Sequence, residues 1–221
     1  MSTSGPARSP DSIRASIVDG TFDDCQARLK DLFNDHAFRD AVGLAGVNSI
    51  NWARVLAQVV YYFTSAVSLG APHRRVSFTV PTGNFGDIYA GSVARAMGLP
   101  VERLVVATNQ NDILDRALKT GDYRVGRVEP SMSPSMDIQV SSNFERALFS
   151  AYDGDGAAVA QLMAELSGQG GFAISQGARE HLAGIFDSGR VSEPETLALV
   201  GQRRGVGGSH PGEPFSRHAR L

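Results

Sequence analysis

This chain of 221 residues contains little cysteine and little lysine, and its net charge is small. Each of these features excludes some classes of structure or function. Cys25 is the only cysteine, so an internal disulfide is excluded and a reducing compartment, the cytoplasm, is expected. A formal net charge of −2 provides no basic surface for nucleic acid or for an anionic membrane. We therefore expect neither as a partner, and we predict no metal site.

Long hydrophobic runs are also lacking. The most apolar segment, residues 52–69, carries Arg54 and Gln58 near its start, and a charge within a membrane span is costly in lipid. This segment therefore predicts a buried helix instead of a membrane anchor. With 42% hydrophobic residues, the chain can bury a sizeable core.

The two ends of the chain differ in composition from its middle. Residues 1–12 are rich in Ser, Pro and Gly and contain no apolar run, which predicts a disordered lead-in. Residues 201–221 are rich in Arg, Gly and Pro and show no hydrophobic period, so we expect them to be disordered as well. Residues 13–200 are predicted to form one ordered domain.

Strand and helix patterns alternate through the middle of this domain. A strand at 75–80 is followed by a helix at 85–97, and a strand at 103–107 by a helix at 113–118. Alternation at this spacing predicts an α/β fold, a parallel sheet with flanking helices. The other expected elements are a strand at 13–18, helices at 22–34, 49–68, 142–152, 157–167, 180–186 and 193–200, a loop at 130–137 and a break at 168–171.

Residues 78–91 are the most informative segment, because a strand ends there, two glycines follow and a helix begins. The first N–H groups of a helix have no partner within it, and the positive end of the helix dipole points the same way. Such a junction is a ready site for an anion, most often phosphate, and glycine lets the backbone approach it closely. The sequence therefore predicts a small phosphate-bearing ligand at the loop residues Thr82, Gly83, Asn84, Phe85 and Gly86.

A second polar loop follows the next predicted strand and contains Asn109, Asn111 and Asp112. Ligands of parallel α/β sheets bind at the carboxyl ends of the strands, so this loop is a candidate part of the pocket. A plain loop that caps the next helix is the alternative. The glycine spacing matches neither the dinucleotide-binding fingerprint nor the P-loop, although a nucleotide-binding α/β protein stays a third alternative.

Five segments of the chain resemble the threonine synthase family, in the order and spacing of that family. The segments are 20–26, 47–54, 80–87, 107–116 and 133–146, and the likeness extends over about 13–200. The resemblance implies a fold-type-II enzyme that depends on pyridoxal phosphate (PLP). It also implies the family reaction, in which O-phospho-L-homoserine and water give L-threonine and phosphate.

The same resemblance assigns the residues of the pocket. Residues 82–86 match the loop that holds the PLP phosphate. The polar residues of two other matched segments are expected near the cofactor or the substrate: Asn48, Ser49, Asn51, Asn109, Asn111 and Asp112. For Asn48 and Ser49 a helix cap is the alternative.

Lysine is where the chain departs from the family. This chemistry needs a lysine that forms a Schiff base with PLP, and the family supplies it from a part upstream of everything matched here. Lys30 and Lys119 are the only lysines, and both fall in charged helical stretches. We therefore expect no catalytic residue and no covalent PLP in this chain, and we interpret 13–200 as an incomplete catalytic domain.

Two functions follow as alternatives. The chain is either a threonine synthase-like protein that is partial or needs its missing part in trans, or a non-catalytic remnant that keeps a phosphate or PLP cradle. The N-terminal part of the family fold, which is missing here, would normally cover one side of the cleft. The apolar surface that its absence leaves exposed would favour self-association. The likeness ends near Gly201, and the Arg-, Gly- and Pro-rich sequence that follows is what a shifted reading frame would give. The 19 arginines against two lysines in the whole chain suit a GC-rich source, in which shifted frames often have this composition. Resequencing would test this hypothesis.

Overall fold

The computed structural model describes residues 19–20, 22–46, 50–192 and 195, and it separates the chain into two compact units. The first unit, residues 1–44, contains α1 (Phe22–Asn34) and α2 (His36–Val42). The helix predicted at 22–34 is confirmed. The second helix was not predicted; the Asp35 carboxylate begins it by accepting a hydrogen bond from the Phe38 N–H at 3.0 Å. The predicted strand at 13–18 lies outside the described residues.

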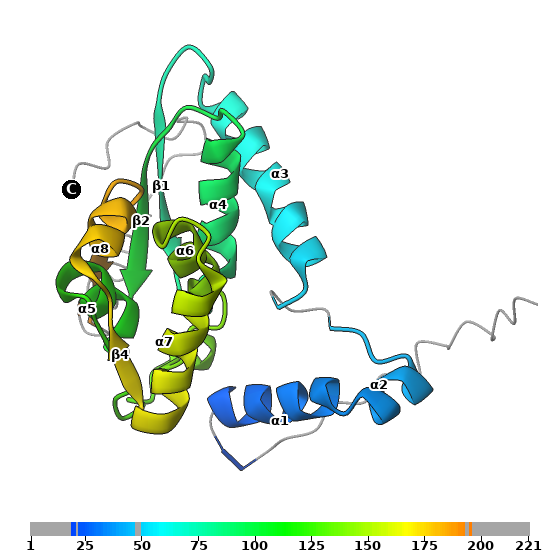
Figure 1. The fold of residues 1–221 in the computed structure, drawn as a ribbon. Coiled ribbons are helices and arrows are strands. Elements are labelled where there is room, and N and C mark those ends of the chain that lie inside the picture. Colours follow the sequence, from blue (N-terminus) through cyan, green and yellow to red (C-terminus); the bar gives the residue numbers. More distant parts are fainter. Residues whose placement is uncertain (1–18, 21, 47–49, 193–194, 196–221) are drawn as a thin grey trace, which may run out of the picture. The chain divides into compact units, whose positions relative to one another are not determined.

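The second unit is built on a parallel sheet of three strands (Figure 1). The strands β1 (Val76–Pro81), β2 (Val101–Thr108) and β5 (Phe186–Arg190) lie in the order β1-β2-β5. The α/β fold with a parallel sheet and flanking helices is confirmed, as are the strands expected at 75–80 and 103–107. The sequence pattern missed β5.

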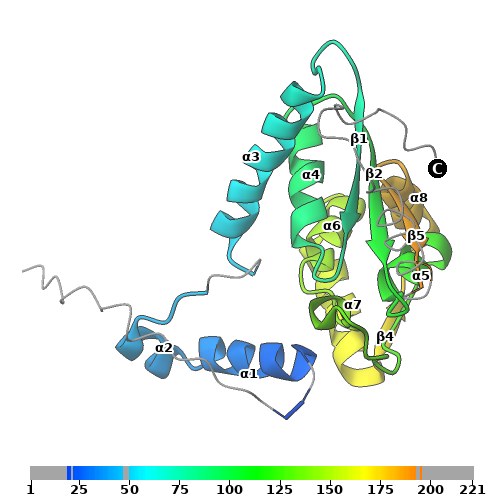
Figure 2. The same ribbon diagram turned by 180° about the vertical axis from the view of Figure 1, so that it is seen from behind.

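Two long helices form successive layers beside the sheet. α4 (Gly86–Ala96) connects β1 to β2, and α3 (Trp52–Ser68) packs on α4 from outside (Figures 1 and 2). α3 begins three residues later than predicted, because the Asn51 side chain caps it by accepting from the Ala53 N–H at 2.9 Å. Each helix is amphipathic, and the apolar faces of the two helices pack against each other. The buried residues of α3 are Val55, Val59, Tyr62 and Ala66.

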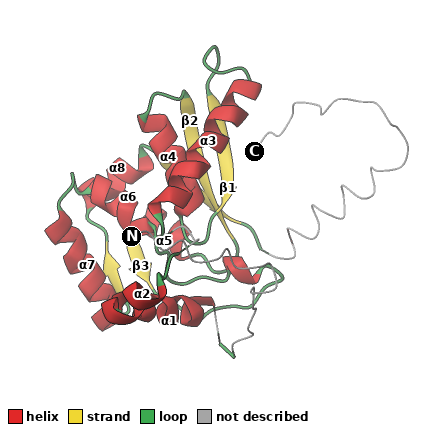
Figure 3. Cartoon of the chain, turned by 90° about the vertical axis from the view of Figure 1, so that its right-hand side faces the viewer, coloured by secondary structure: helices red, strands yellow, loops and turns green. Residues whose placement is uncertain are grey.

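The remaining elements of the second unit lie between β2 and β5 in the sequence. A two-stranded antiparallel sheet stands apart from the main one, as the yellow arrows in Figure 3 show. The expected loop around 130–137 holds one 3-10 turn. The elements are α5 (Ile113–Thr120), β3 (Asp122–Arg124), the 3-10 turn at Pro134–Met136, α6 (Phe144–Ala151), α7 (Gly156–Gln169), β4 (Gly171–Ala173) and α8 (Gln176–Ala183).

The prediction for 180–186 was wrong in its second half. α8 ends at Ala183, and Phe186 opens β5, where it pairs with Leu104 of β2. β5 is short, and its sequence shows no regular alternation of apolar and polar residues. It forms a strand because it pairs with β2, and a local sequence pattern does not reveal such pairing. The break predicted at 168–171 is confirmed, because α7 ends at Gln169, Gly170 is left-handed (φ 72°) and β4 begins at Gly171.

The core of the second unit is held together by aromatic rings from distant segments. Phe85 lies edge-on to Phe144 and to Phe186, each at a centroid distance of 5.1 Å, and Tyr123 stacks between Phe144 and Phe172. Such contacts add about 0.5–1.5 kcal/mol each to the free energy of burial. The rings thereby join the start of α4 to α6, β3, β4 and β5.

Gly91 permits the close contact between α3 and α4. A Cβ at this position would lie 2.7 Å from Cε1 of Tyr62 and 2.9 Å from Cδ2 of Leu104. Neither neighbour can withdraw freely, because the Tyr62 ring is rigid and also packs edge-on to Phe78 at 4.9 Å. A side chain at residue 91 would therefore push α4 away from α3 or from the sheet.

We predict that Gly91→Ala lowers the free energy of unfolding by about 1–3 kcal/mol through overpacking. The matched control is Gly177→Ala on α8, where a Cβ meets nothing within 4 Å. This control should be neutral or raise stability by about 0.4–1 kcal/mol. Denaturant unfolding of the two variants checks the prediction, and equal stability of both would contradict it.

Candidate functional site

The site begins where β1 ends. The Thr82 N–H donates to the Ala107 carbonyl at 2.8 Å, which carries the pairing with β2 one residue past the strand. The Thr82 hydroxyl donates to the Val80 carbonyl at 2.6 Å, so this proton is engaged within the protein. The chain then turns through Gly83 and Asn84 and enters α4 at Gly86.

Phe85 adopts an unusual backbone conformation, and this conformation makes the turn possible. It is the residue that precedes α4, and its φ of 65° and ψ of −3° are left-handed. For a bulky residue this conformation costs on the order of 1–3 kcal/mol. Burying a Phe side chain contributes about 1.5–3 kcal/mol, and the Phe85 ring is 1% exposed in the aromatic core. The core thus offsets the strain, and only the backbone of Phe85 is left for a ligand.

A cavity of about 330 Å³ opens at this junction. It is lined by residues 81–88 together with Arg54 and Gln58 from α3. Among the residues that the structure describes, no acceptor is recorded for the N–H groups of Gly83, Asn84, Phe85 or Gly86. With the positive end of the α4 dipole at this cavity and Arg54 in its lining, these donors favour an anion.

A segment just before α6 holds this loop in place. Ser141 Oγ donates to the Gly83 carbonyl at 2.7 Å, and Asn143 donates to the Asn84 carbonyl through its backbone N–H at 3.1 Å and its Nδ2 at 3.0 Å. Ser142 Oγ lies 3.1 Å from Asn84 Oδ1, which orients that amide. The sequence pattern treated 142–152 as a helix and missed this role, although these residues belong to one of the five family-like segments.

Gly83 is required by the same packing. A Cβ there would lie 2.8 Å from Cδ1 of Ile138 and 3.1 Å from the Ser135 carbonyl oxygen. The Ile138 methyl can move, but the backbone oxygen of Ser135 cannot move freely. The loop and the segment that contains the 3-10 turn therefore approach as closely as only glycine allows.

Asn109 and Asn111 lie at the end of β2 in a buried polar cluster centred on Asp137. Asp137 Oδ1 accepts from Asn109 Nδ2 at 2.9 Å, from Asn111 Nδ2 at 3.0 Å and from Ser131 Oγ at 2.7 Å. Asn111 Oδ1 accepts from the Glu129 N–H at 2.9 Å and from Gln139 Nε2 at 3.3 Å. These bonds fasten the 129–139 loop to the sheet, which favours the structural alternative for Asn111.

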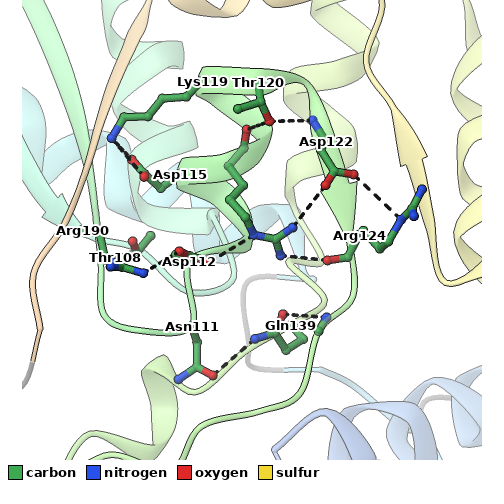
Figure 4. Close-up of polar contacts among 12 residues, drawn as sticks. Thr108, Asn111, Asp112, Asp115, Lys119, Thr120, Asp122, Arg124, Gln139 and Arg190 are labelled. Carbon is green, nitrogen blue, oxygen red and sulfur yellow. Dashed lines mark hydrogen bonds and ion pairs between the residues drawn. The ribbon is translucent and has the colours of Figure 1, made fainter.

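Asp112 forms ion pairs with two arginines and lines neither of the two cavities described here. Its carboxylate contacts Arg116 Nε and an Arg190 guanidinium nitrogen, each at 3.0 Å, so the end of β5 is tied to the start of α5 (Figure 4). Arg116 also donates to the Arg124 carbonyl at 2.8 Å. Asp112 thus completes a charged network on α5, and its pocket role stays a prediction.

Asn109 does reach a cavity. A hollow of about 310 Å³ lies at the carboxyl ends of β1 and β2, and Asn109 and Pro81 line it with mainly apolar neighbours such as Met132 and Val191. Asn111 and Asp112 are not among its lining residues. Since Pro81 also lines the cavity at the start of α4, the two hollows flank the same strand end.

The other three predicted pocket residues precede α3 in the sequence. Asn48 and Ser49 fall outside the described residues, and Asn51 is the cap of α3. Arg146 of α6 donates to the Ile50 carbonyl at 2.9 Å and lies over the Trp52 ring at 5.3 Å. This cation–π contact ties the beginning of α3 to the helix that follows the Ser141–Asn143 contacts.

The two lysines are placed as surface residues. Lys119 Nζ pairs with the Asp115 carboxylate at 2.8 Å on α5 and lines neither cavity (Figure 4). Lys30 is exposed on α1. Within the described part of the chain, no group of three or more His, Cys, Asp or Glu side chains could hold a metal, and no helix is long and apolar enough to cross a bilayer.

The fold and this junction define an α/β protein with a glycine loop and a helix start at the carboxyl end of its sheet. Comparison with known proteins identifies the relatives of this α/β protein. No protein-family model matches the chain. Threonine synthase from Pseudomonas aeruginosa is 49% identical over 192 residues, which cover 87% of this chain and 41% of that protein. Human threonine synthase-like 1 is 37% identical over 83% of this chain and 26% of its own length.

Solved structures give the same result. The crystal structure of PLP-bound threonine synthase from Brucella melitensis is 56% identical, with a TM-score of 0.78, over 86% of this chain and 41% of that chain. Yeast threonine synthase is 46% identical with a TM-score of 0.71. Over most of its length the chain is therefore similar to threonine synthases. It spans about two fifths of the length of the bacterial relatives it matches.

Asp87, in the first turn of α4, provides a pH test of the site. Although the residue is exposed, the turn around its carboxylate desolvates it and raises the pKa of Asp87, while the Tyr62 hydroxyl and Arg54 act in the opposite direction. A raised folded-state pKa means that the folded protein holds the proton longer than the unfolded chain does. Stability is then lost as pH rises through the folded-state pKa.

We predict that Asp87→Asn is progressively more stable than the unmutated protein as pH rises from about 4.5 to 7.5, because the variant has no charge to desolvate. Urea midpoints measured for both proteins across this range test the prediction. A stability difference that is constant, or that shrinks with rising pH, would show that the carboxylate is not penalised in the fold.

Proposed function

We propose that residues 82–86 hold the phosphate of PLP. The observation that carries this proposal is the row of backbone N–H groups at the start of α4, which find no recorded acceptor in the described chain and line a cavity with Arg54. The 56% identity to a threonine synthase whose crystal structure is PLP-bound supports the identity of the anion. The contacts would come from the backbone of Gly83 to Gly86 and from the Asn84 amide, with Thr82 as part of the wall.

The residues present fit a phosphate group. The cavity of about 330 Å³ is large enough for a phosphate and part of a ring, and Gly83 lets the loop that lines it pack closely against Ile138 and the Ser135 carbonyl. Ser142 Oγ lies against Asn84 Oδ1, so the donor end of that amide remains for a ligand. Asp87 carries the one carboxylate in the lining, and its place in the first helical turn is favoured by the dipole.

We further propose that the complete protein has the family activity, conversion of O-phospho-L-homoserine and water to L-threonine and phosphate. PLP, when bound, supplies the electron sink for this chemistry. The residues of this chain would bind and orient the phosphate end of the cofactor, with the 310 Å³ hollow at the strand ends available to the rest of the ligand. Asn109, which lines that hollow, is the best placed of the four predicted pocket residues that the structure describes.

The position of the lysines favours a more limited role for the chain by itself. Lys119 is paired with Asp115 and lines neither cavity, and Lys30 is exposed on a helix of the first unit. We therefore propose that this chain binds PLP through its phosphate without turning over substrate, as a non-catalytic binding module would. A partner that supplies the reactive lysine would restore the family reaction. The cytoplasm remains the proposed compartment.

We predict weak, reversible PLP binding that inorganic phosphate competes away. Borohydride treatment of the mixture should leave no PLP-labelled lysine peptide, measured by visible absorbance and peptide mass spectrometry. Gly83→Val should abolish binding because its side chain would meet Ile138 and the Ser135 carbonyl, whereas Gly177→Ala should bind normally. A labelled Lys30 or Lys119 would contradict the binding-module proposal, and absence of any PLP or phosphate binding would contradict the site itself.

We also propose that the chain self-associates through the outer face of α3. Leu56, Val60 and Val67 recur at helical spacing there and are 53–62% exposed, so they form an apolar stripe along the helix. Contiguous exposed apolar surface of this kind marks interaction surfaces. The three side chains extend over about three turns of one helix, which favours a helix-to-helix contact.

We predict that the purified protein sediments as an oligomer and that the double substitution Leu56→Gln with Val60→Gln shifts it toward the monomer. Met97→Gln is the control, because Met97 is 63% exposed but lies outside this stripe. Analytical ultracentrifugation at several protein concentrations measures the shift. A monomeric parent protein, or an oligomer that the double substitution leaves unchanged, would rule out this surface.

A further inference from the structure

Two consecutive carbonyl groups of the loop are held from the same side. The Gly83 carbonyl accepts from Ser141 Oγ at 2.7 Å, and the Asn84 carbonyl accepts from both the N–H and the Nδ2 of Asn143, at 3.1 and 3.0 Å. Ser141 and Asn143 are 5% and 1% exposed, so water does not compete for these bonds. Their own segment is fixed in turn, because the Ser141 N–H donates to the Tyr123 hydroxyl at 2.8 Å.

Holding a carbonyl also orients the next N–H group. In a trans peptide the C=O and the N–H point in opposite directions across a rigid plane. When Ser141 draws the Gly83 carbonyl toward itself, the N–H of Asn84 is turned away from the 141–143 segment. Asn143 does the same for the N–H of Phe85. Two successive N–H groups are thereby directed to the side of the loop opposite these contacts.

This arrangement creates a backbone anion site without any charged side chain from the 141–143 segment. Successive N–H groups next to a left-handed residue form a concave donor site of the kind that binds phosphate, and Phe85 is left-handed here. Donors that are already oriented need no reorganisation when the anion arrives, which is why preorganisation raises affinity. The strained Phe85 conformation and the two oriented peptides therefore act together.

We propose that Ser141 and Asn143 are positioning residues that set the phosphate affinity of the loop through the orientation of its two peptide planes, without contacting the ligand. The inference rests on the proposed function, since it concerns the same site. It extends that function by assigning the selectivity for the phosphate group to a segment 58 residues away from the loop. Ser141→Ala removes one carbonyl contact and leaves the loop sequence intact.

The test compares PLP with pyridoxal, which lacks the phosphate. Ser141→Ala and Asn143→Ala are expected to weaken PLP binding at least about tenfold, the equivalent of losing one charge-assisted hydrogen bond. Pyridoxal affinity should change less than about twofold, since its contacts do not involve the oriented N–H groups. Ser141→Thr, which keeps the hydroxyl, should restore PLP affinity. Ser175→Ala, which removes the hydroxyl that caps α8, is the control for a purely structural loss.

A second measurement needs no ligand. Residual dipolar couplings of the Asn84 and Phe85 N–H vectors report the orientation of the two peptide planes, and both should change in Ser141→Ala and Asn143→Ala but not in Ser175→Ala. Unchanged couplings, or an equal loss of PLP and pyridoxal affinity, would overturn the inference. If the couplings change while the unmutated protein binds neither PLP nor inorganic phosphate, the proposed function fails and the orienting role stands.

Discussion

The left-handed backbone of Phe85 is the constraint on which the rest of the site depends. It lets the chain leave β1, turn within a few residues and begin α4 with its first N–H groups free of partners among the described residues. The conformation is unfavourable for a large residue, and it persists because the ring is locked between Phe144 and Phe186. Core packing and loop geometry are therefore one feature, since the same residue provides both.

The aromatic core explains why segments distant in sequence meet at the loop. Phe144 is the first residue of α6, so its contact with Phe85 brings the preceding residues, Ser141 and Asn143, to the loop carbonyls. Phe186 opens β5 and ends in the same cluster. A hydrophobic contact thus sets the position of the polar contacts, which then hold the peptide planes.

The similarity to threonine synthases distinguishes two tasks, phosphate recognition and supply of a reactive lysine. A chain that covers about two fifths of its bacterial relatives contains the strand, loop and helix of the proposed anion site together with the segment that supports them. Its two lysines lie on charged helical surfaces. Phosphate recognition and the reactive amine are separable in physical terms, because the first needs oriented backbone donors and the second needs a lysine side chain at the other end of the cofactor.

The sequence by itself determined the local part of this protein: the strand that ends at Pro81, the glycines that follow and the helix that begins near Gly86. Residue type and hydrophobic period report such features directly. Only the tertiary structure decided that Ser141 and Asn143 hold the loop, that Asn111 serves a buried cluster around Asp137, and that Phe186 begins a strand. These contacts join residues 26–82 positions apart, and no local pattern encodes which distant group a serine, an asparagine or a phenylalanine will meet.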